Sequence, residues 1–144
     1  AIPDAVPRDG AWGEDVPFRW MPPEALRKRH FSEKSDVWAF GVTAWELLTD
    51  GEVPYAFIGS NEVVAERVCV VASGWLRRPD GCPAALWMLL QRTWAAAPAE
   101  RPTFTELAGE LALVMPTTPG AGSSSAPLVV DGVYVSPPEQ AMSL

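Results

Sequence analysis

Cysteine, histidine and tyrosine are scarce in this sequence of 144 residues, which holds two cysteines, one histidine and two tyrosines. Cys69 and Cys82 do not form a CxxC pair, and a single histidine cannot complete a usual set of zinc ligands. We therefore expect neither a disulfide framework nor a metal site. A reducing compartment fits this cysteine usage.

Basic residues are outnumbered, because 11 lysines and arginines face 18 aspartates and glutamates, for a net charge of -7. Nucleic acid is therefore not an expected partner, since phosphate binding needs clustered positive charge. The densest basic run, residues 27–30 (RKRH), is short, and we interpret it as a solvated helix end.

The sequence also lacks a long apolar run. The longest dense one extends from Val37 to Leu48, whereas a helix needs about 20 residues to cross a bilayer. The first twenty residues are too charged for a secretory signal, and residue 1 is alanine. We therefore expect that further sequence precedes Ala1 in the parent protein.

The composition that remains is that of a globular chain, with 48% hydrophobic and 20% charged residues. The length allows one domain of ordinary size. Apolar residues show no periodicity in residues 1–17, which we predict to be a loop. Residues 116–127 (PTTPGAGSSSAP) are of low complexity. We therefore place the folded domain at residues 18–115 and a flexible tail at residues 116–144.

The clearest helix is predicted for residues 35–49. Its apolar positions recur with helical spacing along one face, at Val37, Phe40, Gly41, Ala44, Trp45 and Leu48. The opposite side is apolar as well. Because a helix that is apolar all round is normally surrounded by protein, we expect this one to be the central element of the fold.

Four further segments show helical signals. Pro23 is well placed to open a short helix, and Ser60 can cap one that runs to about residue 72, although residues 68–71 would also suit a strand. Residues 84–94 are amphipathic, and Thr103 with Glu106 has capping-box spacing ahead of a last helix. The prediction is a mainly α fold, a helical bundle around one central apolar helix.

Three stretches in fixed order carry a family signature: residues 19–24 (RWMPPE), 35–42 (SDVWAFGV) and 101–104 (RPTF). Together they resemble the C-terminal part of the large lobe of protein kinases, over about residues 15–113. The first resembles the A-P-E element, which closes the activation segment. The other two resemble the start of the central large-lobe helix and the Arg-Pro pair before the last helix.

The resemblance is closest to tyrosine kinases, on residues 17–21 (PFRWM), Ser60-Asn61-Glu62 and the Cys-Pro pair at 82–83. It implies a domain that transfers the γ-phosphate of ATP to protein tyrosine. Two alternatives stay open: a degenerate kinase that serves as a docking module, and a Ser/Thr kinase of the tyrosine-kinase-like branch. A cytoplasmic site, or the cytoplasmic side of a membrane receptor, follows from the resemblance.

The parts that perform phosphoryl transfer are absent from this sequence. It holds no glycine-rich G-x-G-x-x-G loop, no V-A-I-K lysine, no H-R-D and no D-F-G. We therefore assign no catalytic residue here. ATP and Mg²⁺ are expected cofactors of the complete domain and are not expected to bind this chain alone.

What remains resembles the support behind a kinase active site. The resemblance implies an ion pair between Glu24 and Arg101, and it likens Asp36 to an aspartate that bonds the catalytic loop; we call these three residues the brace. Without the resemblance, Glu24 and Arg101 would read as unrelated exposed charges, and Asp36 as a helix N-terminal acid. We expect Asp36 to lack its family partner in this chain.

The resemblance also implies a substrate-facing loop, made of Pro17, Phe18, Arg19 and Trp20, although Trp20 could equally be a core aromatic. The other tryptophans that we single out, and Tyr55, are expected to serve packing. Tyr134 lies in the predicted tail, where phosphorylation would create a site for a phosphotyrosine-reading module; an ordinary tail tyrosine is the alternative. The expected partners are protein substrates.

Overall fold

The computed structural model describes residues 16–71, 76–115, 129–130 and 133–134. The predictions of a loop at residues 1–15 and of a flexible segment at 116–128 lie outside these ranges. The helical elements in chain order are η1 (Phe18–Trp20), α1 (Pro23–Lys28), α2 (Glu33–Leu48), α3 (Asn61–Val70), α4 (Ala84–Thr93), η2 (Pro98–Glu100) and α5 (Phe104–Val114).

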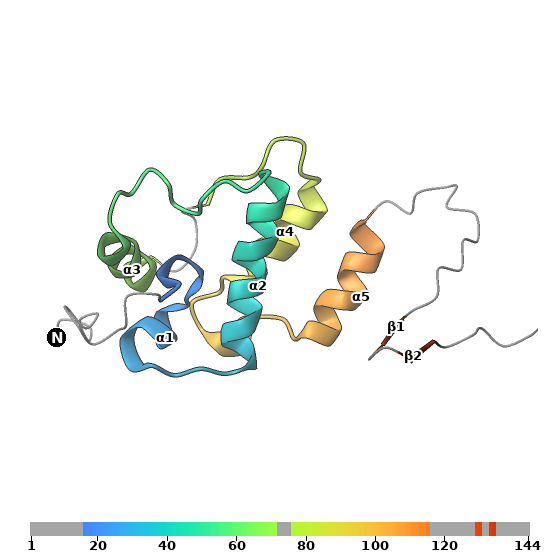
Figure 1. Ribbon diagram of the computed structural model, residues 1–144, viewed down its shortest axis with the longest axis horizontal. Helices are drawn as coiled ribbons and strands as arrows, with labels where there is room; N and C mark the ends of the chain where they lie inside the picture. The colour runs from blue at the N-terminus through green and yellow to red at the C-terminus, as the bar shows by residue number, and fades with distance from the viewer. Residues whose placement is uncertain (1–15, 72–75, 116–128, 131–132, 135–144) are drawn as a thin grey trace, which may run out of the picture.

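Helices lie on two sides of α2, as Figure 1 shows: α1 and α3 lie on one side of it, and α4 and α5 on the other. The predicted mainly α fold around one central helix is confirmed. No helix among the residues that the structure describes is long and apolar enough to cross a membrane.

The central helix begins two residues earlier than predicted. Its N-cap is Ser32, whose backbone N–H donates to Ser35 Oγ at 3.2 Å, so that Glu33 opens the helix. Local capping by two serines therefore fixes the start of the helix, and the apolar pattern that begins at Val37 does not mark it.

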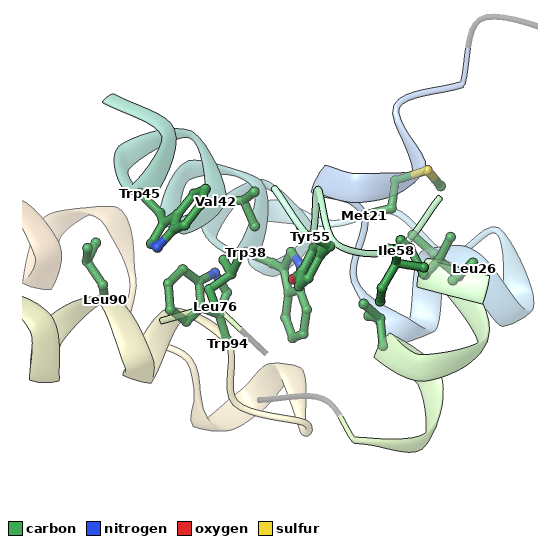
Figure 2. Close-up of a cluster of buried hydrophobic side chains, with 14 of the residues drawn as sticks. Met21, Leu26, Trp38, Val42, Trp45, Tyr55, Ile58, Leu76, Leu90 and Trp94 are labelled. Atoms are coloured by element: carbon green, nitrogen blue, oxygen red, sulfur yellow. The ribbon is translucent and has the colours of Figure 1, made fainter. Parts of the chain in front are cut away.

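The core is built along the inner face of α2. Trp38, Val42 and Trp45 are buried, and Figure 2 shows them projecting from the helix into the cluster that also holds Tyr55 and Trp94. Their burial confirms the predicted packing role of these aromatic side chains. Burial of an aromatic side chain contributes a large favourable free energy to folding.

The expectation that protein covers α2 on every side is wrong for its C-terminal half. Thr43 is exposed, and Leu47 is 76% exposed. Apolar residues on this side of the helix are therefore not buried within the chain, because no described element packs over them.

The remaining helices follow their local signals. The segment that could have been a strand is α3, whose N-cap is Ser60, and α5 begins with the predicted capping box of Thr103 and Glu106. The sequence analysis missed a hairpin in the tail, in which Val129–Val130 pairs antiparallel with Val133–Tyr134. The Asp131-Gly132 pair between these valines is a known hairpin signal.

Candidate functional site: the substrate-facing segment and its brace

The short helix α1 places Glu24 at its first turn. Pro23 occupies the first helical position, where the missing N–H costs nothing, and the buried side chains of Ala25 and Leu26 hold the helix against the core. The helix stops at Arg29, whose backbone is left-handed (φ 51°). Glu24 is therefore fixed by its own helix before it meets any partner.

Arg101 follows the single turn η2 and reaches the core from the other end of the sequence. Its Nη1 donates to Glu24 Oε1 at 2.6 Å and its Nη2 donates to Glu24 Oε2 at 2.9 Å. The Arg101 side chain is 0% exposed and that of Glu24 is 14% exposed. This two-point geometry is the strong form of a carboxylate–guanidinium pair.

Arg101 also donates to two backbone carbonyl oxygens. Nε donates to Ala95 O and Nη1 also donates to Lys34 O, each at 2.9 Å, while Lys34 Nζ donates to Arg101 O at 2.5 Å. The guanidinium carbon lies 5.0 Å from the centre of the Trp38 ring, within cation–π range. The buried charge therefore has partners in several directions.

The pair joins three parts of the chain at once. Ser35 Oγ donates to Glu24 Oε1 at 3.3 Å, so α1, the start of α2 and the approach to α5 meet at this carboxylate. Replacing one partner of such a buried pair typically costs about 3–5 kcal/mol, because a charge is left unpaired, although the intact pair need not add net stability.

Asp36, the third brace residue, does not join this cluster. It lies in the first turn of α2 with its side chain exposed, and its backbone N–H donates to Ser32 O at 3.2 Å. An acidic residue at this position is favoured by the helix dipole. The structure thus brings together Glu24 and Arg101 and leaves Asp36 at the surface.

The four residues of the predicted substrate-facing loop, 17–20, are called the substrate-facing segment below. Phe18 to Trp20 form the single turn η1, with hydrogen bonds from Trp20 N to Pro17 O at 3.0 Å and from Met21 N to Phe18 O at 3.2 Å. Trp20 is half-buried, and its Nε1 donates to Glu46 Oε2 on α2 at 3.3 Å. Both interpretations of Trp20 remain compatible with this position.

Arg19 makes the contacts that the sequence analysis missed. Its guanidinium donates to the carbonyl oxygens of Pro54, Tyr55 and Ile58 and to the side chain of Asn61, at 2.7–2.9 Å. Carbonyl acceptors leave no signal in a sequence, because every residue carries one. Tyr55 itself is buried, and burial raises the pKa of its hydroxyl.

The basic run at residues 27–30 is only partly a solvated helix end. Lys28 and His30 are exposed, but Arg27 is half-buried and donates to Cys69 O near the end of α3. Its side chain reaches α3 because α1 and α3 pack against each other. The interpretation of Arg27 as a solvated residue is therefore wrong.

Few groups at this site could hold a metal ion or react as a nucleophile. Among the residues that the structure describes, no group of three His, Cys, Asp or Glu side chains is placed to bind a metal. Cys69 and Cys82 are free thiols, and burial raises the pKa of Cys69. The arrangement consists of positioning contacts around the substrate-facing segment.

The sequence matches the family "Protein tyrosine and serine/threonine kinase" over residues 7–111, which is most of the chain. The chain belongs to this kinase family. The buried Glu24–Arg101 pair and the central helix α2 are therefore parts of the C-terminal portion of a kinase large lobe.

Individual kinase-family proteins are similar over the same region. "Inactive tyrosine-protein kinase 7" is 50% identical over 103 residues in Gallus gallus and 48% identical over 101 residues in Homo sapiens, in each case 70% of this chain and 9% of the relative. "Tyrosine-protein kinase Btk" of Drosophila melanogaster is 42% identical over 105 residues, 73% of this chain and 13% of the relative. The chain thus spans about a tenth of the length of these relatives.

Proposed function

We propose that this chain is the C-terminal part of the large lobe of a tyrosine-specific protein kinase domain, in which it supports the segment that receives the substrate. The observation that carries the proposal is the two-point bond between Glu24 and the fully buried Arg101. This bond links the helix that follows the substrate-facing segment to the approach to α5. Positioning of this kind is a large part of catalysis in phosphoryl transfer.

The residues present do not fit ATP or Mg²⁺. The motifs that hold these groups in kinases are absent from the sequence, and the described residues contain no cluster of three metal-ligating side chains. No step of phosphoryl transfer is assigned to them. In the proposal, the isolated chain is inactive, and the complete domain supplies the cofactor site from sequence that precedes Ala1.

Tyrosine is the proposed acceptor for two reasons. The substrate-facing segment, PFRW, resembles that of tyrosine kinases except at Phe18, where a smaller Val or Ile is usual. Two of the similar proteins are named "Tyrosine-protein kinase Btk" and "Putative tyrosine-protein kinase F09A5.2", at 42% and 37% identity. A Ser/Thr kinase of the tyrosine-kinase-like branch is the alternative acceptor class. The proposed setting is the cytoplasm or the cytoplasmic side of a membrane receptor.

A second candidate function is a docking module without catalysis. It is favoured by one observation: the relatives named "Inactive tyrosine-protein kinase 7" are 48–50% identical to this chain, whereas Btk and "Activated Cdc42 kinase Ack" are 39–42% identical. The brace would then maintain the fold of a binding surface. Because the residues that decide catalysis are not in this chain, both candidates predict the same structure for it.

The experiment that separates these candidates begins with the transcript upstream of Ala1. An intact lysine strand, H-R-D and D-F-G predict catalysis, and the complete protein should then phosphorylate tyrosine in a peptide array, with a D-F-G aspartate-to-alanine variant as control. Phosphorylation of serine or threonine instead would support the alternative acceptor class. Absent motifs, together with no phosphorylation above a reaction without the protein, would contradict the kinase proposal and support the docking module.

We also propose that Tyr134, in the tail, is phosphorylated and then bound by a phosphotyrosine-reading module. Two features support it: Tyr55, the other tyrosine, is buried, and Tyr134 lies at the end of a two-residue strand after the last helix. Phosphopeptide mapping of the complete protein from cells treated with a phosphatase inhibitor should find phosphate on Tyr134. A map that covers this peptide and never finds it modified would contradict the proposal.

A further inference from the structure

Arg19 has the densest set of polar contacts in the substrate-facing segment. Nη1 donates to Pro54 O at 2.7 Å and to Tyr55 O at 2.9 Å, and Nη2 donates to Ile58 O at 2.9 Å. Nε donates to Asn61 Oδ1 at 2.9 Å. All three nitrogens of the guanidinium are thus engaged within the protein.

The acceptors converge because the loop between α2 and α3 has an unusual backbone. Tyr55 has a left-handed φ of 57°, a conformation that non-glycine residues rarely adopt, and its buried side chain holds it there. Tyr55 O also accepts from Ile58 N at 2.8 Å, which closes a turn. The carbonyl oxygens of Pro54, Tyr55 and Ile58 therefore face one point, which the guanidinium occupies.

The turn that carries Arg19 is held by apolar packing of Phe18 and Trp20 against the core and by the polar contacts of Arg19. η1 is a single 3-10 turn of three residues, and a turn this short does not persist in water without outside contacts. The Trp20–Glu46 hydrogen bond is longer, at 3.3 Å. Three short bonds of Arg19 thus connect the turn to the loop at residues 53–58, and the fourth connects it to Asn61 at the start of α3.

We infer that Arg19 is a positioning residue: it fixes the substrate-facing segment to the loop at residues 53–58, and its guanidinium does not contact substrate. This inference rests on the proposed function for the role of the segment, but the link itself is a property of this chain. A lysine could replace it only in part, because one ammonium group cannot reach four acceptors arranged around a planar fork.

The test is amide hydrogen exchange of the 144-residue chain with Arg19→Leu and Arg19→Lys. In Arg19→Leu, exchange of the Trp20, Met21 and Ile58 amides should accelerate at least about tenfold relative to amides in the middle of α2. Arg19→Lys should show a smaller acceleration at the same amides, and it covers the case in which the leucine variant does not fold. The matched control is Arg77→Leu, since the exposed Arg77 side chain pairs with the exposed Glu52 carboxylate.

A uniform acceleration across α2 and the segment would overturn the inference, because it would mean that Arg19 contributes only to global stability. Unchanged exchange at the three amides in both variants would overturn it as well. In the complete kinase domain, Arg19→Lys should raise KM for a peptide substrate more than it lowers kcat. If the parent protein proves inactive, the proposed function fails, while the exchange result still decides the role of Arg19.

Discussion

At the scale of single residues, Gly41 lets two helices meet. It lies on α2 opposite the end of α4, and a Cβ atom added to it would lie 1.9 Å from Thr93 Oγ1 and 2.8 Å from Trp94 Nε1. The Cβ of Thr93 would be 2.9 Å away, so a rotation of the hydroxyl alone could not relieve the clash. A side chain of any size at this position would push α4 away from α2.

Gly41→Ala should therefore destabilise the chain by about 1–3 kcal/mol, the usual cost of an extra methyl group in a packed core. The control is Gly109→Ala on α5, where an added Cβ would meet nothing within 4 Å. That change should stabilise the chain by up to about 1 kcal/mol, because alanine favours helix more than glycine does. Urea unfolding measures both, and a Gly41→Ala variant as stable as Gly109→Ala would contradict the packing described here.

At the scale of an element, the start of α5 depends on the capping box. The Glu106 carboxylate accepts hydrogen bonds from Thr103 N at 2.7 Å and Thr103 Oγ1 at 3.0 Å, and Glu106 N donates to Thr103 Oγ1 at 3.2 Å. The hydrogen bond from the Thr103 backbone is the largest cause that lowers the pKa of Glu106, followed by that from its hydroxyl. The ionised carboxylate is thus the form that caps the helix.

The lowered pKa of Glu106 determines how the stability of the chain depends on pH. Because the pKa is lower in the folded chain, the contribution of Glu106 is fully present above the ordinary glutamate pKa of about 4.3 and is lost as pH falls through the lowered value. Glu106→Gln keeps a capping acceptor without the charge. The stability difference between the natural chain and this variant should therefore shrink as pH falls from 6 to 3; a difference that stays constant would show that the charge contributes nothing.

Some helices and helix starts could be predicted from the sequence alone. The pattern from Val37 to Leu48 was enough to predict α2, and Thr103 and Glu106 were enough to predict the start of α5, because periodicity and capping are local. The start of α2 at Glu33 was missed, since nothing in the sequence distinguishes Ser32 and Ser35, which cap the helix, from serines in a loop. The hairpin at residues 129–134 was missed although Asp-Gly between valines signals it.

The candidate site was less predictable than the fold. The contact between Glu24 and Arg101 was expected only through the family resemblance, because two charges so far apart in the sequence carry no local signal. The Arg19 link could not be predicted at all. Its acceptors are backbone carbonyls, and their convergence depends on the left-handed conformation of Tyr55.

At the scale of the whole molecule, the Glu24–Arg101 pair joins two residues that are 77 positions apart in the sequence. It joins α1 to the segment before α5, and Ser35 at the start of α2 bonds the same carboxylate. The elements on both sides of the central helix thus meet at one buried charge pair. The account depends on these two side chains acting as a coupled unit.

A double-mutant cycle with Glu24→Leu, Arg101→Met and the double variant tests this coupling most directly. Urea unfolding in a fixed concentration of trimethylamine N-oxide, which favours the folded state, keeps all four proteins measurable. Each single change should cost about 3–5 kcal/mol, and the double change should cost less than their sum by about 2 kcal/mol or more. Costs that add to within about 0.5 kcal/mol, as for independent sites, would contradict the account.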